Sequence, residues 1–278
     1  MNLIPITPSL GAEVEGIDLS QPLHERTFEA LAKAFSEHHV LVFRNQTLSR
    51  DDHKAFARHF GEIHIHPSQR HFRPRGDPEI FLIDIQPDAK GSNGEVWHAD
   101  VTCEAVPPFA SSLYLTEVPD NFGGDTLFAN LQEAFEDLSP SMQQYLMTKR
   151  AFHDGEQDLR RYGIKLKAGQ SYPAHDHPVV IAHPVTGRPV LYVNEGFTSH
   201  LLSVPNFESE FVLSGLFDRI RRNPRLHCRI KWSPNMITLW DNYAVQHQAV
   251  FDYQGFRRYG ERITIAAPGA PKAFGQNA

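Results

Sequence analysis

The sequence predicts a mainly β fold with flanking helices, because many short β-branched and aromatic runs alternate with turns while few segments have helical periodicity. The expected strands are separated by Pro, Gly and Asn residues and do not alternate with helices as they would in a parallel sheet. This pattern is typical of an antiparallel barrel or jelly roll decorated by helices. No repeat, linker or low-complexity tract divides the sequence, so we expect a single domain over residues 1–278.

Four stretches have the apolar spacing of amphipathic helices. The first is 25–37, and the second, 49–60, starts with a capping-box pattern and stops at Gly61. Residues 131–149 predict two helices separated at a Ser-Pro pair. Residues 207–222 predict a long helix. Its expected buried side carries Phe211, Leu213, Leu216, Phe217 and Ile220.

The remaining apolar runs predict strands, and Thr186-Gly187 predicts a hairpin turn between two of them. Two loops, 67–78 and 155–177, are long and rich in Gly, Pro and charged residues, as is typical of lids over a site. The predicted strands are 40–43, 80–83, 112–115, 179–181, 190–193, 228–232, 237–240 and 263–265.

Composition excludes several classes of protein. Cys103 and Cys228 are the only cysteines, which excludes a disulfide framework and a thiolate zinc site and indicates a reducing, cytoplasmic compartment. No apolar run reaches the roughly 18 residues of a membrane span, and the start lacks the pattern of a signal peptide. A net charge of −6 argues against nucleic-acid binding, which needs a clustered basic face.

Three short segments place a histidine two residues from a second metal-ligand type. In extended chain, residues two apart project to the same face, so each segment could present two donors to one ion. Spacing alone does not rank them. The three segments are His64-Ile65-His66, His98-Ala99-Asp100 and His175-Asp176-His177.

The sequence around His98 and Asp100 favours that pair of ligands, because it predicts a rigid, extended segment at the edge of a sheet. One imidazole and one carboxylate supply two-thirds of a 2-His-1-carboxylate facial triad, which leaves three coordination positions open. The best candidate for the third ligand is His247, which directly follows a strongly β-patterned segment.

Two arginines, Arg258 and Arg262, follow the third candidate ligand. A guanidinium offers a fixed bidentate fork to carboxylates and sulfonates, so the pair favours an anionic ligand near the metal. The alternative is a surface ion-pair network with Asp252 and Glu261.

Taken together, these motifs resemble the taurine dioxygenase family of Fe(II)- and 2-oxoglutarate-dependent oxygenases, which also includes aryloxyalkanoate dioxygenases and alkylsulfatases. The resemblance covers nearly the whole chain. It rests on Gly11-Ala12-Glu13-Val14, Gly16-Ile17-Asp18-Leu19, Phe60-Gly61-Glu62, His64-Ile65-His66-Pro67, Trp97-His98-Ala99-Asp100-Val101-Thr102, Gly123-Gly124-Asp125-Thr126, His183-Pro184-Val185-Thr186-Gly187, Val193-Asn194-Glu195-Gly196-Phe197-Thr198, Trp240-Asp241-Asn242 and Gln246-His247.

The resemblance implies a double-stranded β-helix in which His98, Asp100 and His247 hold Fe(II). It also implies that 2-oxoglutarate and O2 are consumed, that succinate and CO2 are formed, and that a small anionic substrate is hydroxylated. By the same resemblance Arg258, assisted by Thr126, binds the distal carboxylate of 2-oxoglutarate. If the hydroxylated carbon carries a sulfonate or an equivalent group, that group is released.

The resemblance further implies that Arg262 receives the acidic head of the substrate. His66 and Phe197 stand where taurine dioxygenases place substrate contacts, and we also expect Val101 at the substrate pocket. Relatives in the family commonly self-associate, so a homo-oligomer is expected.

Two positions depart from the taurine enzymes: Gln69 replaces a tyrosine and Gly155 replaces a phenylalanine. Losing two rings enlarges the predicted pocket, which favours a bulkier anion than taurine, such as a longer alkyl or aryl sulfonate, a sulfate ester or an aromatic carboxylate. A rearranged lid over 155–177 would refill the space.

Two other classes of function compete with the oxygenase. A metal-dependent hydrolase on a cupin-like barrel could use two histidines and a carboxylate, but it needs a general base rather than two spaced arginines. A non-catalytic binding module could share the strand pattern, but it needs no facial triad.

Overall fold

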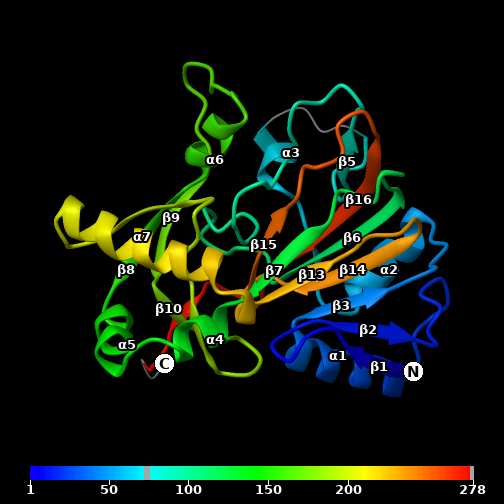
Figure 1. The fold of residues 1–278 in the computed structure, drawn as a ribbon, viewed down its shortest axis with the longest axis horizontal. Helices are drawn as coiled ribbons and strands as arrows, with labels where there is room; N and C mark the ends of the chain where they lie inside the picture. Colours follow the sequence, from blue (N-terminus) through cyan, green and yellow to red (C-terminus); the bar gives the residue numbers. More distant parts are fainter. Residues whose placement is uncertain (72–75, 276–278) are drawn as a thin grey trace.

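The computed structural model describes residues 1–71 and 76–275, and strands dominate it (Figure 1). Its largest sheet has eight strands within these residues, and β5 (Phe81–Ile85) joins it by pairing with β16. The only parallel pair in the described part of this sheet is β2 with β3. The hydrogen-bonded order of the other strands is β1 (Asn2–Pro5), β2 (Ala12–Glu15), β3 (Val40–Phe43), β14 (Met236–Asp241), β6 (Ala110–Glu117), β16 (Arg258–Ile265) and β4 (Ile63–His64).

Nine further strands form three small antiparallel sheets within the described ranges. The expected mainly β fold is confirmed. The predicted hairpin is also present, since β10 and β11 pair around Gly187, whose φ of 68° suits glycine. The small sheets are β13 (His227–Ile230), β7 (Thr126–Asn130) and β15 (Val245–Ala249); β12 (Thr198–Leu201), β8 (Arg150–Asp154) and β9 (Ala174–Pro178); and β11 (Pro189–Leu191), β10 (Val180–Ala182) and β17 (Lys272–Ala273).

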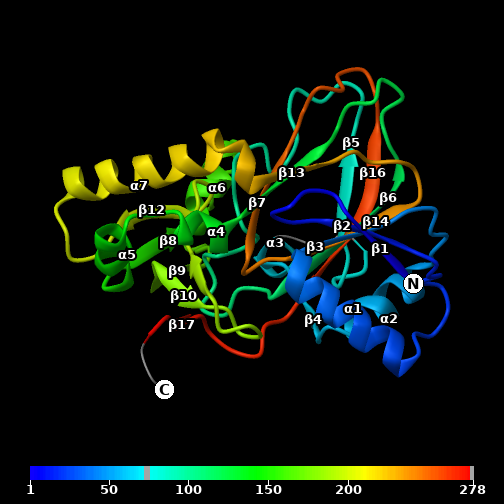
Figure 2. The same cartoon turned by 60° about the horizontal axis from the view of Figure 1, so that its bottom comes forward.

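Helices cover the outside of the sheets. Figure 2 shows α1 and α2 together on one face of the large sheet, whereas α7 lies beside β12 at the other end of the molecule. No helix in the described ranges is long and apolar enough to cross a membrane. The helices are α1 (Glu25–His38), α2 (Arg50–Arg58), α3 (Pro67–His71), α4 (Leu131–Glu136), α5 (Pro140–Met147), α6 (Gly155–Arg161) and α7 (Asn206–Arg222), with a 3-10 turn η1 (Pro224–Leu226).

Local sequence signals explain where α2 and α5 begin. Ser49 accepts a hydrogen bond from the backbone N–H of Asp52, whose carboxylate in turn accepts from the Ser49 N–H, which is the predicted capping box. Ser139 caps α5 with Pro140 in the first turn, so the predicted break between α4 and α5 is confirmed.

One predicted helix face is wrong. Leu213, Leu216 and Ile220 are buried on α7, but the Phe211 side chain is 83% exposed. Residues three and four apart share a helix face, whereas Phe211 is two residues before Leu213 and therefore points to the opposite side.

The segments predicted as lid loops contain regular structure. Residues 155–177 begin with α6 and end in β9, so only the part between these elements is a loop. The 67–78 segment begins with α3, and its residues 72–75 lie outside the described residues.

The large sheet packs on both of its faces. On one face, Phe43 contacts Phe56 of α2 with ring centroids 5.5 Å apart. On the other face, side chains of β3, β6 and β14 pack against Phe128 of β7 and Val245 of β15. This second contact places β15, and with it His247, against the inner face of the large sheet.

Buried neutral histidines make the fold sensitive to acid. His53 of α2 has its Nε2 2.8 Å from the Ser112 hydroxyl, and burial lowers its pKa to about 3. An unfolded chain carries histidine with a pKa of about 6.5, so between these values the unfolded state binds a proton that the folded state excludes. Burial lowers the pKa of His39 and of His177 to about 4, which acts in the same direction.

We therefore expect the free energy of unfolding to fall as the pH falls below about 6, by roughly 1.4 kcal/mol per pH unit for each such histidine. His53→Gln removes one of these titrations and should make the decline shallower. Urea unfolding of both proteins at several pH values checks this, and equal slopes would contradict it.

Candidate metal centre and its cavity

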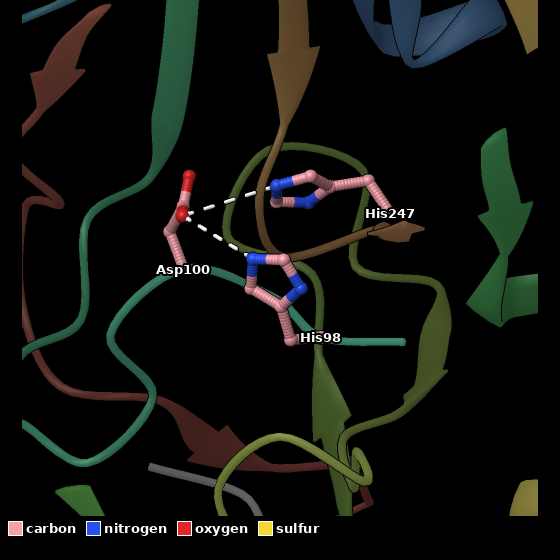
Figure 3. A group of neighbouring side chains, drawn as sticks. All are labelled: His98, Asp100 and His247. Carbon is pink, nitrogen blue, oxygen red and sulfur yellow. Dashed lines mark ion pairs between the residues drawn. The ribbon is translucent and has the colours of Figure 1, made fainter. Parts of the chain in front are cut away.

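Three side chains converge on one point near the inner face of the large sheet. The Nε2 atoms of His98 and His247 each lie 3.9 Å from Asp100 Oδ1. Figure 3 shows both imidazoles pointing toward the carboxylate. The donor atoms of the three residues all lie within 4.8 Å of one another, and no other such group of three occurs among the described residues.

Backbone hydrogen bonds hold the two histidines together. The N–H of His98 donates to the carbonyl of His247 at 3.0 Å, and the N–H of His247 donates back at 2.8 Å. Asn242 fixes the third ligand, because its Oδ1 accepts from the Asp100 N–H at 2.6 Å and its amide donates to the Asp100 carbonyl at 2.9 Å.

The protonation of these groups fits a divalent metal. His98 Nδ1 donates to the Val96 carbonyl at 2.8 Å, which leaves the Nε2 lone pair for an ion. Burial, reinforced by His98, lowers the pKa of His247 well below its ordinary value, so this ring is neutral. Burial would raise the pKa of Asp100, but Arg262 and the two histidines lower it well below its usual range. Two imidazoles and a carboxylate suit iron.

The metal ligands open into a cavity of about 180 Å³. Strands supply one side of it, including Thr126 of β7 and both Arg258 and Arg262 of β16. Helix α6 and the loop that follows it supply Asp158 and Tyr172.

Arg258 is a buried cation without an acidic partner. Its residue is 6% exposed, and its guanidinium makes no hydrogen bond or ion pair with any described residue. The guanidinium carbon lies 5.6 Å from the centre of the Trp232 ring, and burial lowers its pKa. Trp232 Nε1 also donates to the Thr126 hydroxyl at 3.0 Å. A buried unpaired guanidinium is costly unless an anion binds it.

Arg262 faces the metal ligands directly. Its Nη1 donates to Asp100 Oδ1 at 2.7 Å, its guanidinium carbon lies 4.7 Å from the centre of the Phe81 ring, and its buried Nε has no partner within the described residues. The surface network considered as an alternative is wrong, because Glu261 pairs with Arg50 and Asp252 lies near Arg229.

A model of the "Taurine catabolism dioxygenase TauD, TfdA family" matches residues 2–264. The chain belongs to the TauD/TfdA family. It is 36% identical to an alpha-ketoglutarate-dependent sulfonate dioxygenase of Saccharomyces cerevisiae over 94% of this chain, which spans 66% of the yeast protein. It is 32% identical to an alkylsulfatase of Acinetobacter baylyi over 99% of this chain and 88% of that protein. The crystal structure of a taurine dioxygenase from Burkholderia xenovorans superposes with a TM-score of 0.81 at 30% identity, covering 97% of this chain and 92% of that chain.

TauD/TfdA enzymes depend on Fe(II) and 2-oxoglutarate, and the donor set described above fits that requirement. The family expected from the sequence motifs is confirmed. The cavity contains all five residues that the resemblance assigns to metal and 2-oxoglutarate, namely His98, Asp100, His247, Thr126 and Arg258.

Four of the six expected substrate residues also line the cavity: His66, Val101, Phe197 and Arg262. The Ser68 N–H donates to His66 Nδ1 at 3.2 Å, so neutral His66 carries its proton on Nε2. Val101 has a φ of 53°, a strained backbone conformation for a β-branched residue, directly after a metal ligand.

Gln69 and Gly155 are not among the residues that line the cavity. The amide of Gln69 donates to the Ile80 carbonyl at 3.1 Å. A Cβ at Gly155 would lie 2.6 Å from Cδ1 of Tyr172, a residue that itself lines the cavity. The lid therefore refills the space that glycine leaves at this position, which removes one of the two arguments for a larger pocket.

The other paired histidines have structural partners. His64 Nε2 lies 2.6 Å from a carboxylate oxygen of Glu104, and His177 Nε2 donates to the carbonyls of Thr102 and Glu104. The ring of His175 lies against that of His177, with centroids 5.1 Å apart.

Sequence reasoning missed several residues at the site. Asn242 was identified only as part of a motif, and no local sequence signal marks its two hydrogen bonds to the Asp100 backbone. Tyr172 and Asp158 lie in the segment predicted as a loop, so their approach to the metal depends on tertiary packing.

Gly196 leaves room for the first metal ligand, since a Cβ there would lie 2.6 Å from the Cβ of His98. We expect Gly196→Ala to displace His98 and to weaken divalent-metal affinity by roughly 10-fold to 100-fold, the range typical of changes next to ligands. Calorimetric titration with Mn²⁺ measures this.

Gly215→Ala is the matched control, because a Cβ there meets nothing within 4 Å and lies in the α7 helix. It should leave metal affinity unchanged. Wild-type affinity in Gly196→Ala would contradict the assignment of His98 as a ligand.

Proposed function

We propose that this chain is an Fe(II)- and 2-oxoglutarate-dependent dioxygenase that hydroxylates a small anionic organic substrate. The observation that carries the proposal is the buried, unpaired Arg258 in the same cavity as the three metal ligands. Neither a metal-dependent hydrolase nor a non-catalytic binding module requires a buried, unpaired arginine beside two histidines and a carboxylate. No observation favours either alternative.

Different residues of the cavity would bind the metal, the co-substrate and the substrate. Fe(II) would be held by His98, Asp100 and His247. Together with 2-oxoglutarate and O2, the metal would supply the oxidising power to hydroxylate a C–H bond, with succinate and CO2 as co-products. Arg258 would bind the distal carboxylate of 2-oxoglutarate through its guanidinium, and the Thr126 hydroxyl would assist. This anchoring fixes the co-substrate in one orientation.

Arg262 and His66 would bind the anionic head of the substrate. Arg262 has Nε free of partners in the described structure, and His66 carries its proton on Nε2, so both can donate to oxyanions. Phe81 and Phe197 would exclude water from the reacting carbon. A sulfonate, a sulfate ester or a carboxylate would fit these donors, and hydroxylation next to sulfur would release sulfite or an equivalent group. The names of the yeast and Acinetobacter relatives support sulfonates and sulfate esters.

We infer a double-stranded β-helix in a single domain over 1–278, with lids around 67–78 and 155–177. The packing of the β13-β7-β15 sheet on the large sheet supports this architecture. The contribution of α6 and Tyr172 to the cavity wall supports the second lid.

We also propose a cytoplasmic homo-oligomer that binds neither nucleic acid nor membrane. The free cysteines Cys103 and Cys228 and the net charge of −6 support the compartment and the absence of a nucleic-acid partner. Phe207 and Phe211, exposed on α7, support self-association. Light scattering of the purified protein tests the oligomeric state.

The proposed activity predicts substrate-dependent succinate formation in a panel of sulfonates, sulfate esters and aryloxy acids. Anaerobic addition of Fe(II) and 2-oxoglutarate should also give a weak visible charge-transfer band. His98→Ala should abolish both signals, since it removes a metal ligand. Retained activity in His98→Ala, or no succinate with any substrate class, would overturn the proposal.

The proposed role of Arg258 predicts that its substitution changes the binding of 2-oxoglutarate alone. Arg258→Gln should raise the KM for 2-oxoglutarate by at least about tenfold, since a charged hydrogen bond is worth roughly 1.5–3 kcal/mol. Arg257→Gln is the control, because Arg257 pairs with Asp84 and Glu117 on the outside and should leave this KM unchanged. An unchanged KM in Arg258→Gln would refute the assignment.

A further inference from the structure

Trp232 lies on the wall of the metal cavity and contacts two side chains at the co-substrate end. Its indole Nε1 donates to the Thr126 hydroxyl at 3.0 Å, and its ring centre lies 5.6 Å from the guanidinium carbon of Arg258. All three residues line the cavity, and all three are buried. One tryptophan thus touches both groups that would bind the distal carboxylate of 2-oxoglutarate.

The sheets around Trp232 hold its indole in place. Trp232 follows β13, in which Ile230 pairs with Thr126 of β7. Its ring belongs to the apolar cluster between the two sheets, together with Leu113 of β6 and Phe128 of β7. Because strand register and side-chain packing both constrain the indole, its Nε1 is held toward the Thr126 hydroxyl.

The indole determines how the Thr126 hydroxyl can act. An indole nitrogen is only a donor, so the hydroxyl oxygen must accept this bond. Within the described residues the indole is the only hydrogen-bond partner of the hydroxyl, which leaves the hydroxyl hydrogen available to a ligand in the cavity. A hydroxyl that accepts a bond also becomes a stronger donor, because hydrogen bonds in a chain polarise one another.

The same ring lies beside the second anchor, Arg258. A guanidinium within about 6 Å of an indole ring centre is attracted by the negative face of the ring. Gly124 leaves room for the stem of Arg258, since a Cβ there would lie 3.3 Å from Arg258 Cδ. The nearby carboxylate of Asp125 bonds to Arg229 Nε at 2.6 Å. The contacts with Trp232 and Gly124 therefore hold the Arg258 side chain without using its N–H donors.

We propose that Trp232 is a positioning residue for the co-substrate, which aims the Thr126 hydroxyl hydrogen and the Arg258 guanidinium at the distal carboxylate of 2-oxoglutarate. The inference rests on the proposed function and deepens it, because it adds a residue that acts through these two donors. Donors that are already oriented cost less entropy when the ligand binds. A tryptophan that only filled the core could be replaced by phenylalanine without any specific effect on the co-substrate.

The first test is the calorimetric Kd of 2-oxoglutarate for the Mn²⁺-loaded protein, which involves no turnover. Trp232→Phe keeps an aromatic ring beside Arg258 and removes the N–H. It should raise this Kd about threefold to tenfold, the size expected for one neutral hydrogen bond. The Kd of Mn²⁺ should not change, because the N–H bonds to Thr126 and not to a metal ligand. In the Fe(II) enzyme the KM for 2-oxoglutarate should rise by the same factor, whereas kcat at saturating 2-oxoglutarate should be unchanged.

A double-mutant cycle separates positioning from packing. Thr126→Val removes the hydroxyl and should raise the Kd of 2-oxoglutarate about tenfold or more, because this bond is made to a carboxylate. In the Thr126→Val background, Trp232→Phe should change the Kd less than about twofold, since the N–H then has no hydroxyl to orient. Trp97→Phe is the matched control and should keep the wild-type Kd. Trp97 is a buried tryptophan that packs on His227 and is not among the residues that line the cavity.

An unchanged Kd of 2-oxoglutarate in Trp232→Phe would overturn the role of Trp232. Additive effects of the two substitutions, or an equal loss of Mn²⁺ affinity, would overturn it as well. Failure of the proposed function looks different: the wild type would bind 2-oxoglutarate but form no succinate with any substrate class, while the Kd values still test Trp232. A wild type that does not bind 2-oxoglutarate at all would overturn both.

Discussion

The reciprocal backbone hydrogen bonds between His98 and His247 are the constraint on which the metal site depends. They join a segment outside the named strands to β15, and they bring together two ligands from distant parts of the chain. Strand β15 is itself held by pairing with β7 and by packing on the large sheet. The geometry of the ligands is therefore a property of the sheets, and the third ligand joins it through Asn242.

Two arginines beside the candidate metal ligands make the cavity suitable for binding anions. Arg258 is enclosed without a carboxylate among the described residues, and Arg262 is bonded to the carboxylate of Asp100. An enclosed guanidinium without a carboxylate, such as that of Arg258, reduces stability unless a ligand compensates it. A protein with a net charge of −6 can thus bind anions, because the local field of two arginines outweighs the distant surface charge in a closed cavity.

Local sequence patterns predicted much of this structure, whereas the remaining features depend on tertiary packing. The capping box at Ser49 and the Ser-Pro break before α5 are encoded within a few residues, so they could be read directly. The spacing of His98 and Asp100 likewise indicated a shared face. In contrast, the exposure of Phe211 and the approach of Tyr172 to Gly155 depend on which surfaces meet in the fold, and a single sequence does not encode that locally.

The wall of the cavity is built from two different kinds of structure. Thr126, Arg258 and His247 lie on strands whose positions are fixed by several hydrogen-bonded neighbours. Asp158 and Tyr172 come from a short helix and the loop after it, which contact the rest of the site through a small apolar cluster. Substitutions in such a segment disturb few backbone hydrogen bonds. Thr126, Arg258 and His247 are therefore positioned by the sheets, whereas α6 and the loop after it form a part of the wall that fewer backbone hydrogen bonds constrain.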